Sequence, residues 1–363
     1  MRADAKIGLA LSGGGIRACI FHLGVCKGLA AHGLLGRVAS ISSVSGASLC
    51  VALIFAASGN RWPSDRYFLT RTLPEIERRI MTHDIQAAAL CRLPFMPRYW
   101  FNRVGLLARA LCREWGICGT LQELPDYPYW EINCTTYETG KNFRIRKDYM
   151  GDYMLGYTQR ADLPIADMAA ASAGFPVLIG AYVLDMTRYI WTVGKHGGKE
   201  TAPRKQCALW DGGVYDNLGL EALYKIGRGL DAEINFLIVS NASGALGAAE
   251  HSVSRPLSGL KRLLDIALDQ VSALRTRDIL SAIIAKGDGL YIQIGETTQQ
   301  IARRHGLDET SAARLLPNCL TSEEATRAAH YPTTLRTPSQ GDFNLLLQHG
   351  YEAAVCSVSC QAL

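Results

Sequence analysis

The segment KIGLALSGGGIRACIFHLGVCKGLAAH, residues 6–32, decides the fold of this 363-residue protein. Its first six residues form a short apolar run, which predicts a buried strand, and the serine and three glycines that follow predict a tight loop. Residues 16–32 carry apolar side chains at helical spacing, and this helix should end before Gly33. A strand that passes through a glycine loop directly into a helix is typical of α/β folds.

The chain repeats this order in its next part. Residues 38–44 (VASISSV) alternate and are rich in β-branched side chains, so they predict a second strand, whereas residues 47–57 are apolar all round and predict a buried helix. Two such units predict a parallel sheet with right-handed crossovers. The fold class expected from these patterns is α/β with a mostly parallel central sheet. Further strands are expected over residues 129–134, 182–193, 207–210, 235–240 and 290–294, and further helices over residues 165–172, 257–284, 299–315, 321–330 and 339–355.

Residues 60–115 interrupt this order. They are rich in arginine and aromatic residues, contain four prolines and predict an insertion of short helices. Between residues 61 and 113 there are ten arginines, no lysines and four acids, and this stretch accounts for the whole net charge of +5. Such a stretch favours an anionic partner, such as a membrane surface, a nucleic acid or a nucleotide. A solvated helical face is the alternative explanation.

Length and composition fit one large domain or two. We expect a single domain over residues 1–363, with residues 60–115 as a helical cap or insertion and residues 241–363 as a C-terminal, mainly helical extension. No apolar stretch approaches the roughly 18 residues of a membrane-spanning helix. The 11 cysteines are scattered and follow no signal peptide, which predicts reduced thiols in a cytoplasmic protein without a metal site.

The glycine loop, residues 13–18 (GGGIRA), fits the dinucleotide-binding pattern G-x-G-x-x-A. That pattern also needs an acidic residue about twenty positions later, but there is no Asp or Glu between Asp4 and Asp65. A phosphate-binding P-loop fails too, because no Gly-Lys-Ser/Thr follows. Consecutive glycines at a helix start can instead point several backbone N–H groups into one site, as an oxyanion hole requires. A tight turn without chemistry is the alternative.

Ser45 lies between the second predicted strand and the second predicted helix, where a nucleophile would stand. A nucleophile elbow needs small residues two positions before and after the serine, since strand and helix crowd together there. Glycine is the usual choice, whereas this chain has Ser43 and Ala47. Gly46 adds backbone freedom, so the size rule is met although the strict G-x-S-x-G motif is not. A serine in an ordinary turn is the alternative. Three other serines lack this placement at the strand tip: Ser42, Ser43 and Ser48.

A serine nucleophile needs a base, and an aspartate fits this sequence better than a histidine. None of the eight histidines lies in a glycine-flanked position at a strand end. Asp211 follows a predicted strand and precedes Gly212 and Gly213, so its carboxylate should face a site rather than the surface. Asp216 competes by type, but its place before a predicted helix is that of an N-cap.

Together these pieces resemble the patatin-like phospholipase family. The matching motifs are SGGGIRA (residues 12–18), SVSGA (residues 43–47) and DGG (residues 211–213), and the first two lie about 30 residues apart, as in the family. INCTTYETGKNF (residues 132–143) and ASAGFP (residues 171–176) also resemble blocks of this family. The resemblance spans about residues 6–240.

The resemblance implies a three-layer α/β/α fold with a mostly parallel central sheet. It also implies a lipid acyl hydrolase of the phospholipase A type with a Ser–Asp dyad and no cofactor. Ser45 would be the nucleophile, and Asp211 the general base that takes its proton directly, so that an acyl-serine intermediate forms. Arg17 would position the glycine loop or a lipid phosphate. The oxyanion hole would come from the loop residues Gly13, Gly14, Gly15, Ile16 and Arg17.

The expected partner is a phospholipid membrane surface that the protein contacts peripherally from the cytoplasm. Arginines interleaved with aromatic rings suit such a surface, because rings pack at the headgroup level and cations attract anionic lipid. A helical subdomain packed on the core is the alternative for these residues. The rings concerned are Trp62, Tyr67, Phe68, Phe95, Tyr99, Trp100 and Phe101.

Two other functions stay open at this point. One is a phospholipase effector of antiphage defence switched on by a small anionic activator such as a cyclic nucleotide, for which the basic loop GKHGGK (residues 194–199) and the arginine-rich insertion are candidate sites. The other is a catalytically inactive lipid-binding protein. A nucleic acid polymer is not expected as a partner, and the oligomeric state, a homo-oligomer included, stays open.

Overall fold

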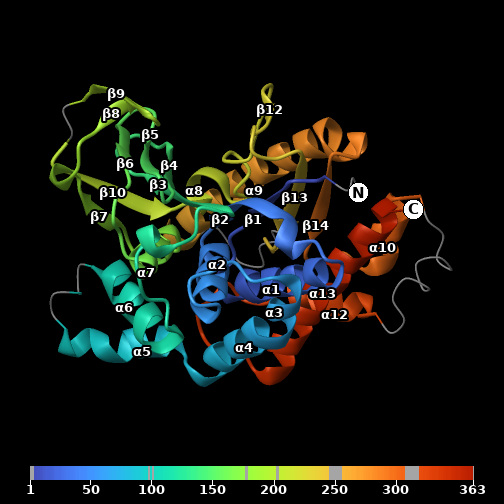
Figure 1. Ribbon diagram of the computed structural model, residues 1–363. Helices are drawn as coiled ribbons and strands as arrows, with labels where there is room; N and C mark the ends of the chain where they lie inside the picture. Colours follow the sequence, from blue (N-terminus) through green and yellow to red (C-terminus); the bar gives the residue numbers. More distant parts are fainter. Residues whose placement is uncertain are drawn as a thin grey trace.

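In the computed structural model a central sheet lies between layers of helices (Figure 1). The structure describes residues 4–96, 99, 102–175, 179–201, 204–244, 256–306 and 319–362. Five parallel strands form the centre of the sheet in the order β14-β13-β1-β2-β3, which confirms the predicted fold class. Their bounds are β1 Ile7–Leu11, β2 Val38–Val44, β3 Tyr129–Thr136, β13 Phe236–Asn241 and β14 Gly289–Gln293.

Beyond β3 the sheet continues with antiparallel strands, which form the lobe at the upper left of Figure 1. The basic loop expected over residues 194–199 is the turn and second strand of a hairpin, β8–β9. The sequence did not predict β5, β6 and β9, because a strand of four residues is too short to show a pattern. The bounds are β4 Asn142–Ile145, β5 Tyr149–Asp152, β6 Gly156–Gln159, β7 Tyr182–Asp185, β8 Thr192–Gly194, β9 Gly197–Glu200 and β10 Gln206–Asp211, with a separate hairpin of β11 Tyr224–Lys225 and β12 Gly229–Leu230.

Helices cover both faces of the central strands. Alternate side chains of β1 show the two cores, since Leu9 and Leu11 pack in the larger core and Ala10 packs in a second one with Ile279 of α9. Strands buried on both faces explain the continuous apolar runs of the sequence. The helices are α1 Gly15–Ala31, α2 Gly46–Ala57, α3 Asp65–Tyr67, α4 Leu73–Thr82, α5 Ile85–Arg92, α6 Arg103–Trp115, α7 Ile165–Ser172, α8 Gly213–Asp216, α9 Pro256–Ala282, α10 Thr298–Arg304, α12 Ser322–Ala329 and α13 Gln340–Ala362.

The C-terminal helix α13 lies against α1 at very close range (Figure 1). A Cβ atom on Gly24 would collide with the Leu347 carbonyl oxygen, and one on Gly350 would collide with the Phe21 carbonyl oxygen. Glycine at both positions therefore lets the two backbones touch. Residues 241–363 were expected as a C-terminal extension. Instead, β14 joins the central sheet beside β13, and α13 packs on α1.

Where the structure describes residues 60–115, they form short helices that pack on the core. Among the rings expected at a membrane, Phe68 is fully buried and Trp62 packs on Phe55, whereas Tyr67 and Phe95 are exposed. Trp100 and Phe101 lie outside the described residues. In the described part of the chain, no helix combines the length and the apolar character needed to cross a bilayer.

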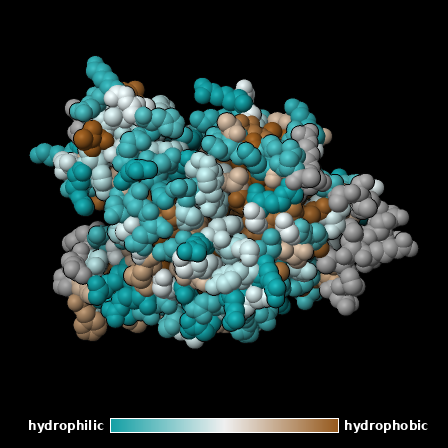
Figure 2. Space-filling view, viewed as in Figure 1, coloured by the Kyte–Doolittle hydropathy of each residue, from teal (hydrophilic) through white to brown (hydrophobic). Residues whose placement is uncertain are grey.

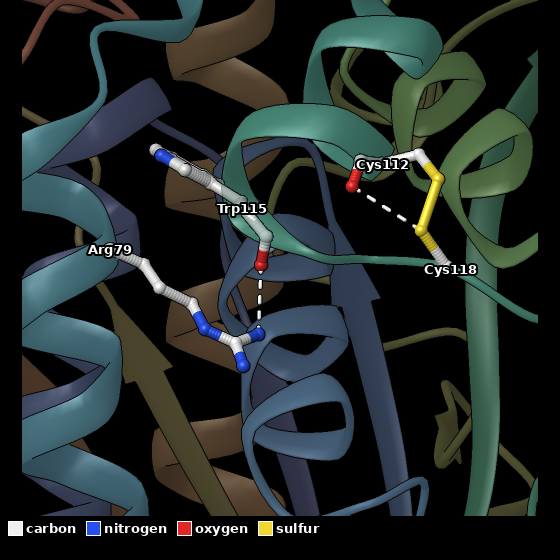
Figure 3. The surroundings of a disulfide bond; sticks show 4 residues. All are labelled: Arg79, Cys112, Trp115 and Cys118. Atoms are coloured by element: carbon white, nitrogen blue, oxygen red, sulfur yellow. Dashed lines mark hydrogen bonds between the residues drawn. A yellow bond between two sulfur atoms is a disulfide. The ribbon is translucent and has the colours of Figure 1, made fainter.

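Cys112 and Cys118 form a disulfide at the end of α6, so the prediction that all the cysteines are reduced thiols is wrong (Figure 3). The helix ends at Trp115, and the φ of 67° at Gly116 turns the chain back and brings the Cα atoms of Cys112 and Cys118 to 5.0 Å. Beside the disulfide, Arg79 of α4 donates to the Trp115 carbonyl oxygen at 2.8 Å and ties α4 to α6. In the part of the chain that the structure describes, the other nine cysteines are not in disulfides.

Candidate active site

Ser45 occupies a strained turn at the tip of β2. Its backbone has φ 54° and ψ −122°, a positive φ that costs a non-glycine residue free energy and that is typical of a nucleophile elbow. Within residues 41–50, all of which the structure describes, only Ser45 is not buried. The elbow therefore forms without its two outer glycines, and it presents this one residue to solvent.

Asp211, the last residue of β10, faces Ser45. The Ser45 hydroxyl lowers the pKa of this carboxylate, so the two side chains lie close together, and Asp211 Oδ1 accepts a hydrogen bond from the Gly213 amide at 2.7 Å. Burial raises the pKa of Asp211 to about 6, whereas the Gly213 amide and the Ser45 hydroxyl act in the opposite direction. A carboxylate with this pKa is ionised at neutral pH and is still basic enough to take a proton.

Two glycines allow the segments around this pair to approach each other. A Cβ atom on Gly212 would collide with the Asn133 carbonyl oxygen of β3. A Cβ atom on Gly46 would collide with the backbone of Gly15. The first contact places the D-G-G turn beside β3, and the second places the glycine loop over the start of α2.

The glycine loop lies directly beside the elbow. A Cβ atom on Gly13 would lie 3.1 Å from the Cβ of Ser45. Gly14 and Gly15 have φ values of 144° and 62°, which favour glycine. These conformations turn the chain from β1 into α1 above the Ser45 side chain.

Two of the amides predicted for the oxyanion hole have other partners. The Gly13 amide donates to the Asn217 carbonyl oxygen at 3.0 Å, and the Ile16 amide donates to the Thr334 carbonyl oxygen at 2.8 Å. Among the described residues, no acceptor pairs with the amides of Gly14 and Gly15. The predicted oxyanion hole therefore loses the amides of Gly13 and Ile16, and the amides of Gly14 and Gly15 remain candidates for it.

Arg17 ties α1 to distant segments. Its Nε donates to the Ala242 carbonyl oxygen at 3.1 Å, and its Nη1 donates to the carbonyl oxygens of Tyr331 at 2.6 Å and Ala329 at 3.3 Å. Burial lowers the pKa of this guanidinium to about 10. The side chain thus supports the glycine loop from behind.

His22 also supports the loop from behind. Its two ring nitrogens lie 2.8 Å from Ser240 Oγ and 2.9 Å from the Ser12 carbonyl oxygen. Burial lowers the pKa of His22 to about 4, so the ring is neutral. This agrees with a packed histidine rather than a base.

Asp216 is not the N-cap of a helix, contrary to the expectation, because α8 ends at this residue. Its carboxylate accepts from the amides of Leu218 and Glu221 at 3.2 and 2.9 Å. Arg275 of α9 lies 3.5 Å away. Asp216 therefore organises a turn, while Asp211 meets Ser45.

Two residues that the sequence did not assign to the site lie behind the elbow. Ser172 Oγ accepts from the Ser45 amide at 3.0 Å and donates to the Asn133 carbonyl oxygen at 2.8 Å. Asn133 Nδ2 in turn donates to Ser42 Oγ at 2.9 Å and to the Ser43 carbonyl oxygen at 3.0 Å. Both residues fall in blocks that resemble the family, but a resemblance of blocks assigns no contact.

Comparison with known proteins gives the family of this fold and site. The sequence profile described as "Patatin-like phospholipase" matches residues 9–224, more than half of the chain. The chain belongs to the patatin-like phospholipase family. A comparison with curated proteins gives no match.

Solved structures share the fold at low sequence identity. Human GIVD cytosolic phospholipase A2 matches with a TM-score of 0.56 and 12% identity, over 99% of this chain and 60% of that chain. The same human protein in complex with methyl gamma-linolenyl fluorophosphonate inhibitor and terbium chloride gives 0.52 and 13%, over 99% and 59%. This chain thus spans about three-fifths of that relative's length, and the likeness shows the fold alone.

Proposed function

We propose that this protein hydrolyses fatty acyl esters of phospholipids, with Ser45 as the nucleophile and Asp211 as the general base. The observation that carries the proposal is the strained elbow that places Ser45 beside the buried Asp211 carboxylate, whose pKa the Ser45 hydroxyl lowers. Membership of the patatin-like phospholipase family supports lipid acyl hydrolase activity.

In the first half of the reaction, Asp211 takes the hydroxyl proton as Ser45 Oγ attacks the ester carbonyl carbon. The amides of Gly14 and Gly15 stabilise the negative oxygen of the tetrahedral intermediate, and the N-terminus of α1 adds positive potential there. Asp211 then gives its proton to the departing lysolipid oxygen. The fatty acyl group stays on Ser45.

In the second half, Asp211 takes a proton from water, and the hydroxide attacks the acyl-serine carbonyl. The intermediate collapses with release of the fatty acid, and the Asp211 proton returns to Ser45 Oγ. One aspartate therefore acts as base and then acid in both halves, which a pKa near 6 allows.

We also propose that the enzyme meets its substrate at a membrane surface through the outer end of the insertion. Leu90 of α5 is 56% exposed and Phe95 is 85% exposed. Figure 2 shows hydrophobic side chains at this end of α5 within a mostly hydrophilic surface. Exposed apolar side chains among arginines suit an interfacial contact.

The test is hydrolysis of phospholipid vesicles with identification of the released fatty acid and lysolipid. Ser45→Ala and Asp211→Asn should each lower kcat by at least about 1,000-fold. Asp216→Asn, checked for folding by its melting temperature, is the matched control and should stay active. An active Ser45→Ala would exclude this nucleophile. An active Asp211→Asn beside an inactive but folded Asp216→Asn would move the base to Asp216.

A further inference from the structure

We propose that buried hydroxyl groups on Ser43, Ser48 and Ser172 form a one-way hydrogen-bond chain that positions Ser45 for attack. This inference rests on the proposed function, because it takes Ser45 as the nucleophile. It assigns a role to a serine that stands where the usual elbow has glycine.

This series of hydrogen bonds runs from Trp130 of β3, behind the elbow, to Ser172 at the C-terminal end of α7. Trp130 Nε1 lies 2.8 Å from Ser43 Oγ, and Ser43 Oγ lies 2.9 Å from Ser48 Oγ. Ser48 Oγ lies 2.9 Å from Ser172 Oγ, which donates to the Asn133 carbonyl oxygen at 2.8 Å. All three serines are completely buried, so water does not compete for these hydrogen bonds.

The two ends of the chain determine the direction of every bond in it. The Trp130 indole N–H can only donate, and a backbone carbonyl oxygen can only accept. Ser172 gives its one hydroxyl proton to the Asn133 carbonyl, so Ser48 must donate to Ser172. Since the Ser48 proton is then used, Ser43 must donate to Ser48 and accept from Trp130.

Ser172 completes the chain as the acceptor for the nucleophile. Its Oγ accepts from the Ser48 hydroxyl and from the Ser45 amide at 3.0 Å, and this uses both of its lone pairs. With its proton held by Asn133, the Ser172 hydroxyl cannot rotate away. The Ser45 backbone is thereby held at a positive φ, a conformation that needs support from its surroundings.

The same end of α7 also holds the backbone around the base. The Gly212 amide donates to the Ser172 carbonyl oxygen at 3.3 Å, and the Asp211 amide donates to the Gly174 carbonyl oxygen at 3.1 Å. Ser172 therefore contacts the backbone next to both members of the Ser45–Asp211 pair. Such contacts hold nucleophile and base in register, and small misplacements there are costly for the rate.

Ser43 is a link in this chain. A glycine in its place would match the usual elbow motif, but it would leave the buried Trp130 indole N–H without an acceptor. A buried donor without a partner is costly. We therefore expect Ser43→Gly, a change toward the usual motif, to lower activity.

The test compares Ser43→Gly, Ser48→Ala and Ser172→Ala with the wild type. Ser357→Ala is the matched control, because Ser357 is a completely buried helical serine whose hydroxyl has no partner within the described residues. The measurements are kcat and KM on a soluble p-nitrophenyl ester, the rate at which a fluorophosphonate labels Ser45, and hydrogen exchange of the Ser45 amide by mass spectrometry.

Ser172→Ala should lower kcat and the labelling rate by about tenfold or more, with KM and the midpoint of the pH profile unchanged, and it should speed Ser45 amide exchange. Ser43→Gly and Ser48→Ala should each lower kcat by about threefold to tenfold. Adding Ser48→Ala to Ser172→Ala should change little, because both break the same chain. Ser357→Ala should match the wild type in all three measurements.

Unchanged kcat and unchanged Ser45 amide exchange in Ser172→Ala would overturn the inference. A higher kcat for Ser43→Gly, or independent losses from Ser48→Ala and Ser172→Ala, would overturn it as well. If the wild type neither hydrolyses the ester nor reacts with the probe, the proposed function fails instead. Hydrogen exchange would then still decide whether the chain holds the Ser45 backbone.

Discussion

The burial of Asp211 sets the pH range in which the proposed dyad can act. The carboxylate must be ionised to take the Ser45 proton, and its pKa is raised from 3.8 to about 6. We expect kcat/KM on a soluble ester to rise with pH through a midpoint near 6 and to level off above it. A profile that is flat from about pH 5 to 8 would show that Asp211 has an ordinary pKa or is not the base.

The same burial should cost stability at neutral pH. Between pH 3.8 and about pH 6, the folded state binds more protons at Asp211 than the unfolded state does. The free energy of unfolding therefore falls as the pH rises through this window. The cost above the window is on the order of 3 kcal/mol. Asp211→Asn should therefore be inactive but should melt at a higher temperature than the wild type at about pH 8.

Thermal unfolding at two pH values checks this prediction. The advantage of Asp211→Asn should shrink as the pH approaches about 4, where the wild-type carboxyl group is protonated in the folded state. An equal or lower melting temperature at about pH 8 would contradict the assigned cost of burial.

The sequence predicted the position of the Asp211 carboxylate but not the partners of the loop amides. The D-G-G turn distinguished Asp211 from Asp216, because only a glycine-flanked carboxylate could approach another segment closely. The sequence could not show that the Gly13 and Ile16 amides are used by Asn217 and Thr334. Those acceptors lie about 200 and 300 residues away along the chain.

At the scale of elements, the arginine-rich insertion serves partly as a structural unit. Arg78 and Arg79 of α4 pair with Glu75 at 2.7 Å, and Arg92 of α5 pairs with Glu114 of α6 at 2.7 Å. These pairs neutralise part of the local positive charge. Charge alone is therefore a weaker reason for membrane binding than the exposed apolar end of α5.

The apolar end of the insertion can be tested directly. The double variant Leu90→Asp and Phe95→Asp should weaken binding to phospholipid vesicles by at least about tenfold, since each side chain would contribute about 1.5–3 kcal/mol on burial. Hydrolysis of a soluble ester should stay unchanged. The comparison is a second double variant, Ile190→Asp with Val193→Asp, which changes two exposed side chains in or near β8. Loss of vesicle binding in this pair alone would place the contact on the antiparallel lobe.

Elements differed in how well the sequence predicted them. The strand at residues 38–44 and the helix at residues 165–172 have the bounds that were expected, because long apolar or alternating runs determine both. The helix expected over residues 299–315 is shorter: α10 ends at Arg304, and Gly306 has a φ of 77°. Residues 307–315 lie outside the described residues. Short strands of the lobe were missed, since their pairing rather than their composition makes them strands.

At the scale of the whole molecule, the contact between the first and last helices closes the fold. Gly24→Ala should destabilise the protein by about 1–3 kcal/mol, because a Cβ there meets the backbone of α13 and overpacks the contact. Gly259→Ala in α9 is the matched control, since among the described residues no atom outside its own helical turn lies within 4 Å of its added Cβ. The control should gain up to about 1 kcal/mol from helix propensity. Chemical unfolding measures both, and equal effects would contradict the role of the close contact.

The sequence by itself determined the strand–loop–helix units, the elbow at Ser45 and the glycine turn after Asp211. Each depends on backbone conformations that few residue types allow within a handful of neighbouring positions. Only the tertiary structure decided which loop amides are free, how far the pKa of Asp211 rises and which serine holds the elbow. These properties depend on burial and on contacts between distant segments, such as the hydrogen bond from the Ser45 amide to Ser172, 127 residues away, and no local pattern encodes such a contact.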